Sequence, residues 1–265
     1  MPRKITRIGL IGFGQIGSDV YRRIEANPQT GMQVVFVADK DSNLLAELPR
    51  ELVLDDLNDF EGRKPDLVIE MAHKDVAKHW APLILTKCDM MVVSVTAIAD
   101  RDNERMFKDL TREHGTRLFL PHGGVVGMDS LIECRDALDS VHVVMKKNPM
   151  NVDLELVNID PQSITTETVL YDGPARDACS KFPRNVNTIA AIAYASLGLD
   201  ETRATLIVNP QWNTATVALH ATGPGLEMNI ERIEQITGVT GATTPASMYN
   251  SIQSICNQEP GIHLR

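Results

Sequence analysis

Hydrophobic and polar positions follow two kinds of pattern in the first 120 residues. Short apolar runs predict buried strands at residues 8–11, 33–38, 66–70, 89–95 and 116–120, with a further short strand at 52–54. Between them, amphipathic stretches such as 75–86 and 101–114 predict helices. Apolar strands that alternate with helices are typical of a parallel sheet covered on both faces. We therefore predict an α/β fold that begins with a doubly wound, Rossmann-type sheet.

The pattern changes after residue 122, where strands become more frequent. Strands are predicted at 141–145, 165–171, 202–208, 214–221 and 226–233, and helices at 128–138 and 185–197. This order predicts a second, α+β domain built on a mostly antiparallel sheet. A last helix begins near Thr244, with Pro245 in its first turn. We expect it to pack against the first domain, which would then comprise 1–122 and 244–265, with 123–243 as the substrate and catalytic domain.

Composition and charge narrow the class of protein. The 265 residues carry a formal net charge of −9, which argues against nucleic acid or an anionic membrane as a partner. Four cysteines are scattered without a C-x-x-C pair, and no apolar run approaches the length of a membrane span. The chain starts almost directly with the first strand and shows no signal peptide. These features predict a cytoplasmic protein with reduced thiols.

The most informative motif is Gly12-x-Gly14-x-x-Gly17, which lies between the first strand and the first helix. In dinucleotide-binding proteins the first glycine allows a tight turn, the second a close approach to the pyrophosphate, and the third close packing of helix on sheet. Gln15 and Ile16 lie at the helix start, where N–H groups face the phosphates. Asp39 follows the second strand, where a carboxylate binds the adenosine ribose and disfavours a 2′-phosphate. NAD is therefore the expected cofactor, and the neighbouring Lys40 leaves NADP open.

Ligands bind at the carboxyl ends of such strands. Ala72, His73, His122 and Gly124 lie at these ends and are expected to line the site. His220, next to small residues on a predicted strand, is the best candidate for proton transfer near neutral pH. In the segment 182–187, Arg184 is a candidate for holding a substrate carboxylate, and Asn185 and Asn187 are candidate polar contacts. No spacing of ligands predicts a metal site.

Five stretches together resemble the L-aspartate dehydrogenase family. They are residues 11–17, 66–73, 121–129, the segment 172–176 with 182–187, and the strand that carries His220. The stretches at 121–129 and 172–187 are the most specific. The resemblance implies a homodimeric enzyme that transfers a hydride from L-aspartate to NAD(P), giving iminoaspartate and then oxaloacetate and ammonia, or the reverse. It also implies that His220 is catalytic and that Gly124 and Asn187 contact the cofactor.

The chain departs from the family pattern at two places near the expected pocket. His122-Gly123-Gly124 stands where the family has a small Ser-Gly-Ala run, and 243–247 lacks the lysine of its Asn-Pro-Lys-Thr-Ser run. A dehydrogenase or reductase of a related amino, imino or keto acid therefore stays an alternative, as does a sensor that binds NAD without turnover. Arg184, Lys146 or Lys147 are candidates for offsetting the charge of substrate carboxylates.

Overall fold

The computed structural model describes residues 5–237, 240–241 and 243–256, and its first unit is a five-stranded parallel sheet. The strands are β1 (Thr6–Ile11), β2 (Met32–Ala38), β3 (Leu67–Glu70), β4 (Asp89–Val92) and β5 (Leu118–Phe119), in the order β2-β1-β3-β4-β5. The helices α1 (Gln15–Ala26), α2 (Lys74–Ile84) and α3 (Arg101–His114) connect them. This arrangement confirms the predicted Rossmann-type sheet.

Three predicted strands of this unit are clearly shorter than expected. The strand predicted at 116–120 covers only Leu118–Phe119. Residues 52–54 contribute only an isolated parallel bridge between Val37 and Val53. The strand predicted at 89–95 ends at Val92, and Val95–Ala99 forms a 3-10 turn instead. The backbone N–H of Ser94 turns toward the carboxylate of Glu70 rather than toward a neighbouring strand, which ends the ladder there.

The second unit is a six-stranded mixed sheet. Its strands are β6 (Ser140–Lys147), β7 (Thr168–Pro174), β8 (Arg203–Val208), β9 (Thr214–Gly223), β10 (Leu226–Thr237) and β11 (Thr240–Gly241), in the order β11-β10-β9-β6-β8-β7. The β6–β8 pair is parallel and the other pairs are antiparallel, so the sheet is mostly antiparallel, as predicted. The helices are α4 (Met128–Cys134), α5 (Ala175–Lys181) and α6 (Asn187–Ala195). The sequence pattern does not predict α5, a short helix directly after Pro174.

Strand alternation divides this sheet into two unlike faces. On β9, Val217 and Leu219 are buried on the inner face and His220 is exposed on the outer face. The cross-strand register extends each face to its neighbours: Met145, Val217 and Arg232 form one row, and His142, His220 and Asn229 form another. The hydrogen-bonded register of the strands thus determines which side chains of the second sheet face the first unit.

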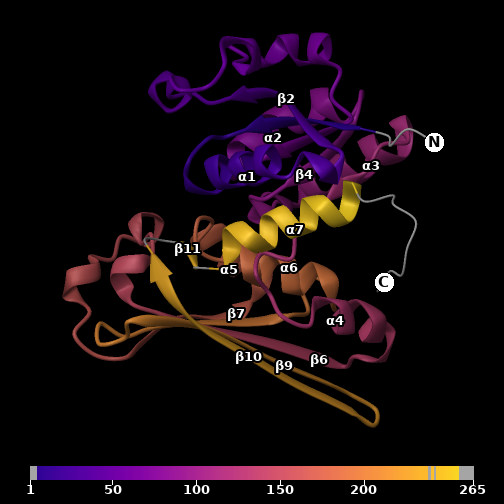
Figure 1. The fold of residues 1–265 in the computed structure, drawn as a ribbon. Helices are drawn as coiled ribbons and strands as arrows, with labels where there is room; N and C mark the ends of the chain where they lie inside the picture. The colour runs from indigo at the N-terminus through magenta and orange to yellow at the C-terminus, as the bar shows by residue number, and fades with distance from the viewer. Residues whose placement is uncertain (1–4, 238–239, 242, 257–265) are drawn as a thin grey trace.

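The last helix, α7 (Thr244–Cys256), lies between the two sheets (Figure 1) and packs against α1. Met248, Tyr249 and Ile252 bury their side chains in a core that includes Val20 and Ile24 of α1. The remaining residues of the predicted 244–265 segment, 257–265, lie outside the described residues. The domain boundaries themselves stay a prediction.

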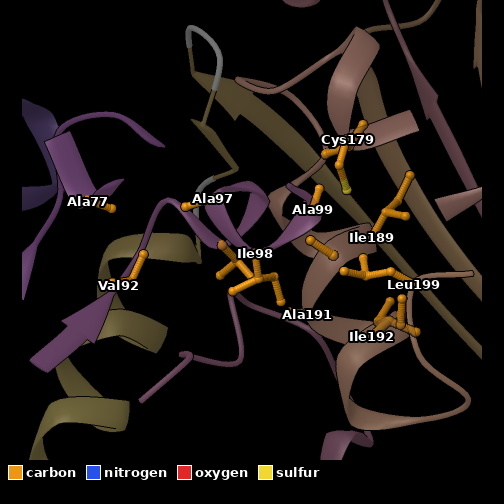
Figure 2. Close-up of a cluster of buried hydrophobic side chains, with 14 of the residues drawn as sticks. Ala77, Val92, Ala97, Ile98, Ala99, Cys179, Ile189, Ala191, Ile192 and Leu199 are labelled. Carbon is orange, nitrogen blue, oxygen red and sulfur yellow. The ribbon is translucent and has the colours of Figure 1, made fainter. Parts of the chain in front are cut away.

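An apolar contact joins the two units. The buried turn Val95–Ala99 after β4 packs against α6 and α5, as Figure 2 shows for Ile98 beside the α6 residues. These residues belong to one continuous core that reaches both sheets. The contact of this turn with α5 and α6 therefore holds the two sheets in a fixed position on either side of the space between them. Within the described ranges, no helix combines the length and the apolar character needed to cross a membrane.

Candidate functional site

The glycine loop after β1 has the geometry that the motif predicts. Gly12 has a φ of +95°, and a side chain there would lie 2.8 Å from the backbone of Met71. A Cβ on Gly17 would lie 2.1 Å from the carbonyl oxygen of Gly12, so helix and turn are in close contact. A Cβ on Gly14 would meet no protein atom within 4 Å. Contacts within the protein thus do not require glycine at position 14. A ligand that lies close to the backbone there would require it.

Asp39 lies beside this loop. Its carboxylate accepts a hydrogen bond of 2.6 Å from the backbone N–H of Phe13 and one of 2.9 Å from that of Asp41. The first bond links the end of β2 to the glycine loop. Because each carboxylate oxygen has a second lone pair, Asp39 retains capacity for ribose hydroxyls.

A buried carboxylate organises the loops after β3 and β4. Glu70 is fully buried and accepts hydrogen bonds from the backbone N–H groups of Ala72 and Ser94 and from the Ser94 hydroxyl, at 2.7, 3.2 and 2.9 Å. Burial raises the pKa of Glu70 to about 7, against the lowering effect of these hydrogen bonds. Next in the chain, His73 caps α2 by accepting from the N–H of Asp75 at 3.3 Å. Glu70 therefore holds two of the ligand-facing loops together.

A pocket lies between the two sheets, and we call it the interdomain pocket. Ile16 of α1, Val93 after β4 and Asn187 of α6 line one side, and Met145, Lys147, Val217, Arg232 and Glu234 of the second sheet line the other. It encloses about 740 Å³, including solvent at its mouth. The pocket thus places the start of the first helix opposite polar groups of the second sheet.

The second-sheet side of the interdomain pocket is charged. Lys147 is 8% exposed, and burial lowers its pKa to about 8, with Glu234 opposing and Arg232 adding to the effect. Arg232 forms an ion pair with Glu234 at 2.8 Å and donates to the carbonyl oxygen of Gly124. Glu234 also accepts from the hydroxyl of Thr243 at 2.8 Å. With Arg184 at the rim, the lining has three cationic side chains and one carboxylate, which favours an anionic ligand.

Three candidate residues of the segment 182–187 line the interdomain pocket, and they differ in their contacts. Asn187 begins α6, lines the interdomain pocket, and accepts a 3.0 Å hydrogen bond from the backbone N–H of Thr96. Asn185 is buried, and its amide oxygen accepts from the N–H of Asp153 at 2.9 Å, so it shapes the loop. Arg184 is mostly exposed and pairs with Asp153 at 3.3 Å. Val186 occupies the N-cap position of α6.

Other predicted residues line two neighbouring hollows. Ala72, His73 and Ser94 line one, and Arg184 and Asn187 line both that hollow and the interdomain pocket. His122 and Gly124 line the other together with Arg232, which also faces the interdomain pocket. The backbone N–H of Gly124 donates to the hydroxyl of Ser247 on α7 at 2.9 Å. These predicted residues therefore surround the interdomain pocket from two sides.

His220 is not brought to the interdomain pocket. It is exposed on the outer face of β9, and its Nδ1 lies 2.7 Å from the amide oxygen of Asn229. The expected open pocket face carries Ala215 and Val217 instead, because strand alternation puts positions 215 and 217 on the side of the first unit. The catalytic role of His220 stays a prediction, and the geometry separates this residue from the pocket by the sheet itself.

The sequence analysis did not identify Arg232 and Glu234 as site residues. It named Lys147 only as one of three candidates for the substrate carboxylates, without a position in the site. Charges occur on both faces along β10, at Glu231 as well as Arg232, so alternation alone does not distinguish the inner face. A signal for Lys147 was present. Lys147 follows Val141, Val143 and Met145 at every second position of the strand. This spacing places the lysine on the same, buried strand face as these apolar residues.

Comparisons with known proteins agree with this architecture. Residues 131–255 match the family model "Aspartate dehydrogenase, C-terminal", and residues 12–121 match "Homoserine dehydrogenase, NAD binding domain". An L-aspartate dehydrogenase of Methanococcoides burtonii is 32% identical over 77% of this chain and 79% of its own length. An aspartate dehydrogenase domain-containing protein of Xenopus tropicalis is 29% identical over 93% of each chain.

Among solved structures, aspartate dehydrogenase from Thermotoga maritima has a similar fold. It has a TM-score of 0.74 at 19% identity, over 97% of this chain and 99% of that one. The two family models together extend over both units, from the glycine loop to the last helix. This chain belongs to the L-aspartate dehydrogenase family.

Proposed function

We propose that this protein is an NAD(P)-dependent L-aspartate dehydrogenase, which oxidises the Cα–N bond of aspartate to iminoaspartate or catalyses the reverse reductive amination. The observation that carries the proposal is the interdomain pocket. It joins the start of the nucleotide-binding helix, at Ile16, to the cationic side chains Lys147 and Arg232. A dicarboxylate needs such an environment in a chain with a net charge of −9. Family membership supports the same reaction.

The residues of the first unit fit a pyridine dinucleotide. The open space around Gly14 and the start of α1 suit a pyrophosphate, for which Gly12, Gln15, Ile16 and Gly17 form the rest of the cradle. Asp39 lies where ribose hydroxyls would bind, and its charge favours NAD over NADP. We assign cofactor contacts also to Ala72, His73, Gly124 and Asn187, which surround the pocket.

A bound nicotinamide supplies the acceptor for the hydride that leaves the substrate Cα. The protein's own residues bind and orient the substrate. Arg232, anchored by Glu234 and the carbonyl of Gly124, offers a fixed guanidinium for one carboxylate. Arg184 at the rim and His122 in the neighbouring hollow are further substrate contacts in this proposal. Met145 and Val217 add apolar side chains to the lining of the same pocket.

We further propose that the protein acts in the cytoplasm as a homodimer, as the resemblance to the family implies. The outer face of the second sheet supports this proposal, since Val169 and Ile233 expose large apolar side chains on its strands. Light scattering coupled to gel filtration measures the mass of the assembly. A mass of one 29.2 kDa chain would exclude the dimer.

The proposed function is tested by the rate of reduced-nicotinamide formation with L-aspartate, L-glutamate and L-alanine, each with NAD and with NADP. We expect turnover with aspartate and a preference for NAD. In an Asp39→Ser variant the preference should shift toward NADP, because the repelling carboxylate is removed. Tight binding of NADH without turnover of any amino, imino or keto acid would instead identify a sensor. Turnover of another acid, without aspartate, would identify the related dehydrogenase.

A further inference from the structure

Lys147 has an unusual position for a lysine. It is the last residue of β6, and strand alternation places it with Val143 and Met145 on the buried inner face. Its side chain is almost fully enclosed, yet it lines the interdomain pocket. Lysines are seldom buried unless they are paired with a carboxylate. The partners of this ammonium group therefore decide its role.

The carboxylate whose charge acts on Lys147, that of Glu234, is already engaged. Glu234 pairs with Arg232 at 2.8 Å and accepts from Thr243. Within the described residues, the ammonium group of Lys147 donates a long hydrogen bond of 3.4 Å to the carbonyl oxygen of Asn185. The charge of Arg232 on β10 also acts on Lys147, and Arg184 lines the same pocket at its rim. A buried amine with weak hydrogen bonding and cations nearby loses its proton more easily than a surface lysine.

The other side chains of the interdomain pocket are poorly suited to moving a proton. Arg184 and Arg232 stay protonated at any physiological pH. Asn185, Asn187 and Thr188 do not titrate in that range, and Glu234 is held in its ion pair. Among the described residues that line this pocket there is no histidine. Lys147 is thus the side chain there whose protonation can change without breaking an ion pair.

We propose that Lys147 is the catalytic residue that exchanges a proton with the amino group of the substrate. This inference rests on the proposed dehydrogenase function. The neutral amine of Lys147 takes one proton from the α-ammonium group of aspartate and becomes an ammonium. The substrate's freed nitrogen lone pair forms the C=N bond as the Cα–H bond breaks and its two electrons leave with the hydride to NAD. The products are protonated iminoaspartate, NADH and protonated Lys147, so charge and atoms balance.

The chain provides a matched control in Lys146, which is adjacent in sequence but lies on the opposite face of β6. We expect Lys147→Met and Lys147→Arg each to reduce kcat for aspartate oxidation by roughly 10²–10⁴-fold. Arginine retains the positive charge but does not release a proton, so a purely electrostatic role would leave Lys147→Arg active. The sequence analysis named Lys146 as a candidate for the substrate carboxylates, but it is not among the described residues that line the interdomain pocket. Lys146→Met should therefore keep the wild-type rate. The Kd for NADH should stay near the wild-type value in all three variants.

A readout independent of activity is the titration of lysine 13Cε signals by NMR in the protein without substrate. The Lys147 signal, identified by its loss in Lys147→Arg, should titrate near pH 8. Titration of Lys147 at an ordinary lysine value, about 10.4, would overturn the proposal. The proposal would also be overturned if the wild-type protein oxidises aspartate and the Lys147→Arg variant does so at a similar rate. A wild-type protein that oxidises no aspartate would overturn the proposed function as well.

Discussion

The amide oxygen of Asn187 accepts a 3.0 Å hydrogen bond from the backbone N–H of Thr96. This bond joins the first residue of α6 to the turn that follows β4, and so it links the two units at the edge of the interdomain pocket. The same side chain also lines the hollow beside Ala72 and His73. Asn187 therefore fixes the distance between the nucleotide-binding loops and the second unit.

Replacement of Asn187 by alanine should weaken NADH binding by about tenfold, the typical worth of one hydrogen bond together with the loosened Thr96 loop. Titration of NADH fluorescence measures the Kd. Asn58→Ala, a change of the same type at an exposed residue that is not among those lining the interdomain pocket, is the control. Equal affinities of the two variants would show that Asn187 does not position the cofactor site.

Two glycines of the loop after β1 should respond differently to alanine. Gly14→Ala should keep the thermal stability of the wild type, because the added Cβ meets no protein atom, and should raise the Kd for NADH at least tenfold. Gly17→Ala places a Cβ 2.1 Å from the Gly12 carbonyl oxygen and should destabilise the fold by about 1–3 kcal/mol. Thermal unfolding and NADH titration separate the two effects. Undiminished NADH affinity in Gly14→Ala would contradict the pyrophosphate assignment.

Glu70 should make stability depend on pH. Its pKa is raised by burial to about 7 in the folded protein, from an ordinary value of 4.5 in the unfolded chain. Between these values the folded state binds more protons, so stability falls as pH rises from about 4.5 to 7, by up to about 3 kcal/mol. Urea unfolding at pH 5 and pH 7.5 measures the difference. Glu70→Gln should reduce this pH dependence, and an equal dependence in the variant would exclude Glu70 as its source.

His220 should contribute little to turnover, because it lies on the outer face of β9 and contacts Asn229. We expect His220→Ala to keep kcat within about threefold of the wild type. A catalytic role, as the resemblance to the family implies, would give a loss of roughly 10²–10⁴-fold. Steady-state rates with aspartate distinguish the two. A large loss of kcat, with NADH binding intact, would show that His220 reaches the substrate in another arrangement of the protein.

The sequence predicts most of the fold because its strongest signals are local. Helix 101–114 has the same bounds in the structure as in the pattern, since Asp100 caps it and Gly115 ends it with a positive φ. The glycine motif likewise predicts its turn. In contrast, the strand at 89–95 is too long in the prediction, because a long-range hydrogen bond from Ser94 to Glu70 ends it. Such a contact leaves no trace in a local hydrophobic pattern.

The site is harder to predict because it depends on which face of a strand points inward. For β9, alternation alone separates Val217 from His220 but does not say which of them faces the first unit. The register with Met145 and Arg232 decides it, and register is a property of the whole sheet. Family resemblance names a histidine on this strand. The pairing of the strands in the folded sheet instead brings Lys147 and Arg232, and not this histidine, into the pocket.

The most direct test of this account is a crystal structure of the protein with NAD and succinate, a dicarboxylate that lacks the amino group needed for reaction. We predict that succinate lies in the interdomain pocket, with a carboxylate within hydrogen-bond distance of Arg232 and its carbon chain near Lys147. Electron density for succinate beside His220 on the outer face of the second sheet, with none between the two sheets, would contradict the assignment of the pocket as the active site.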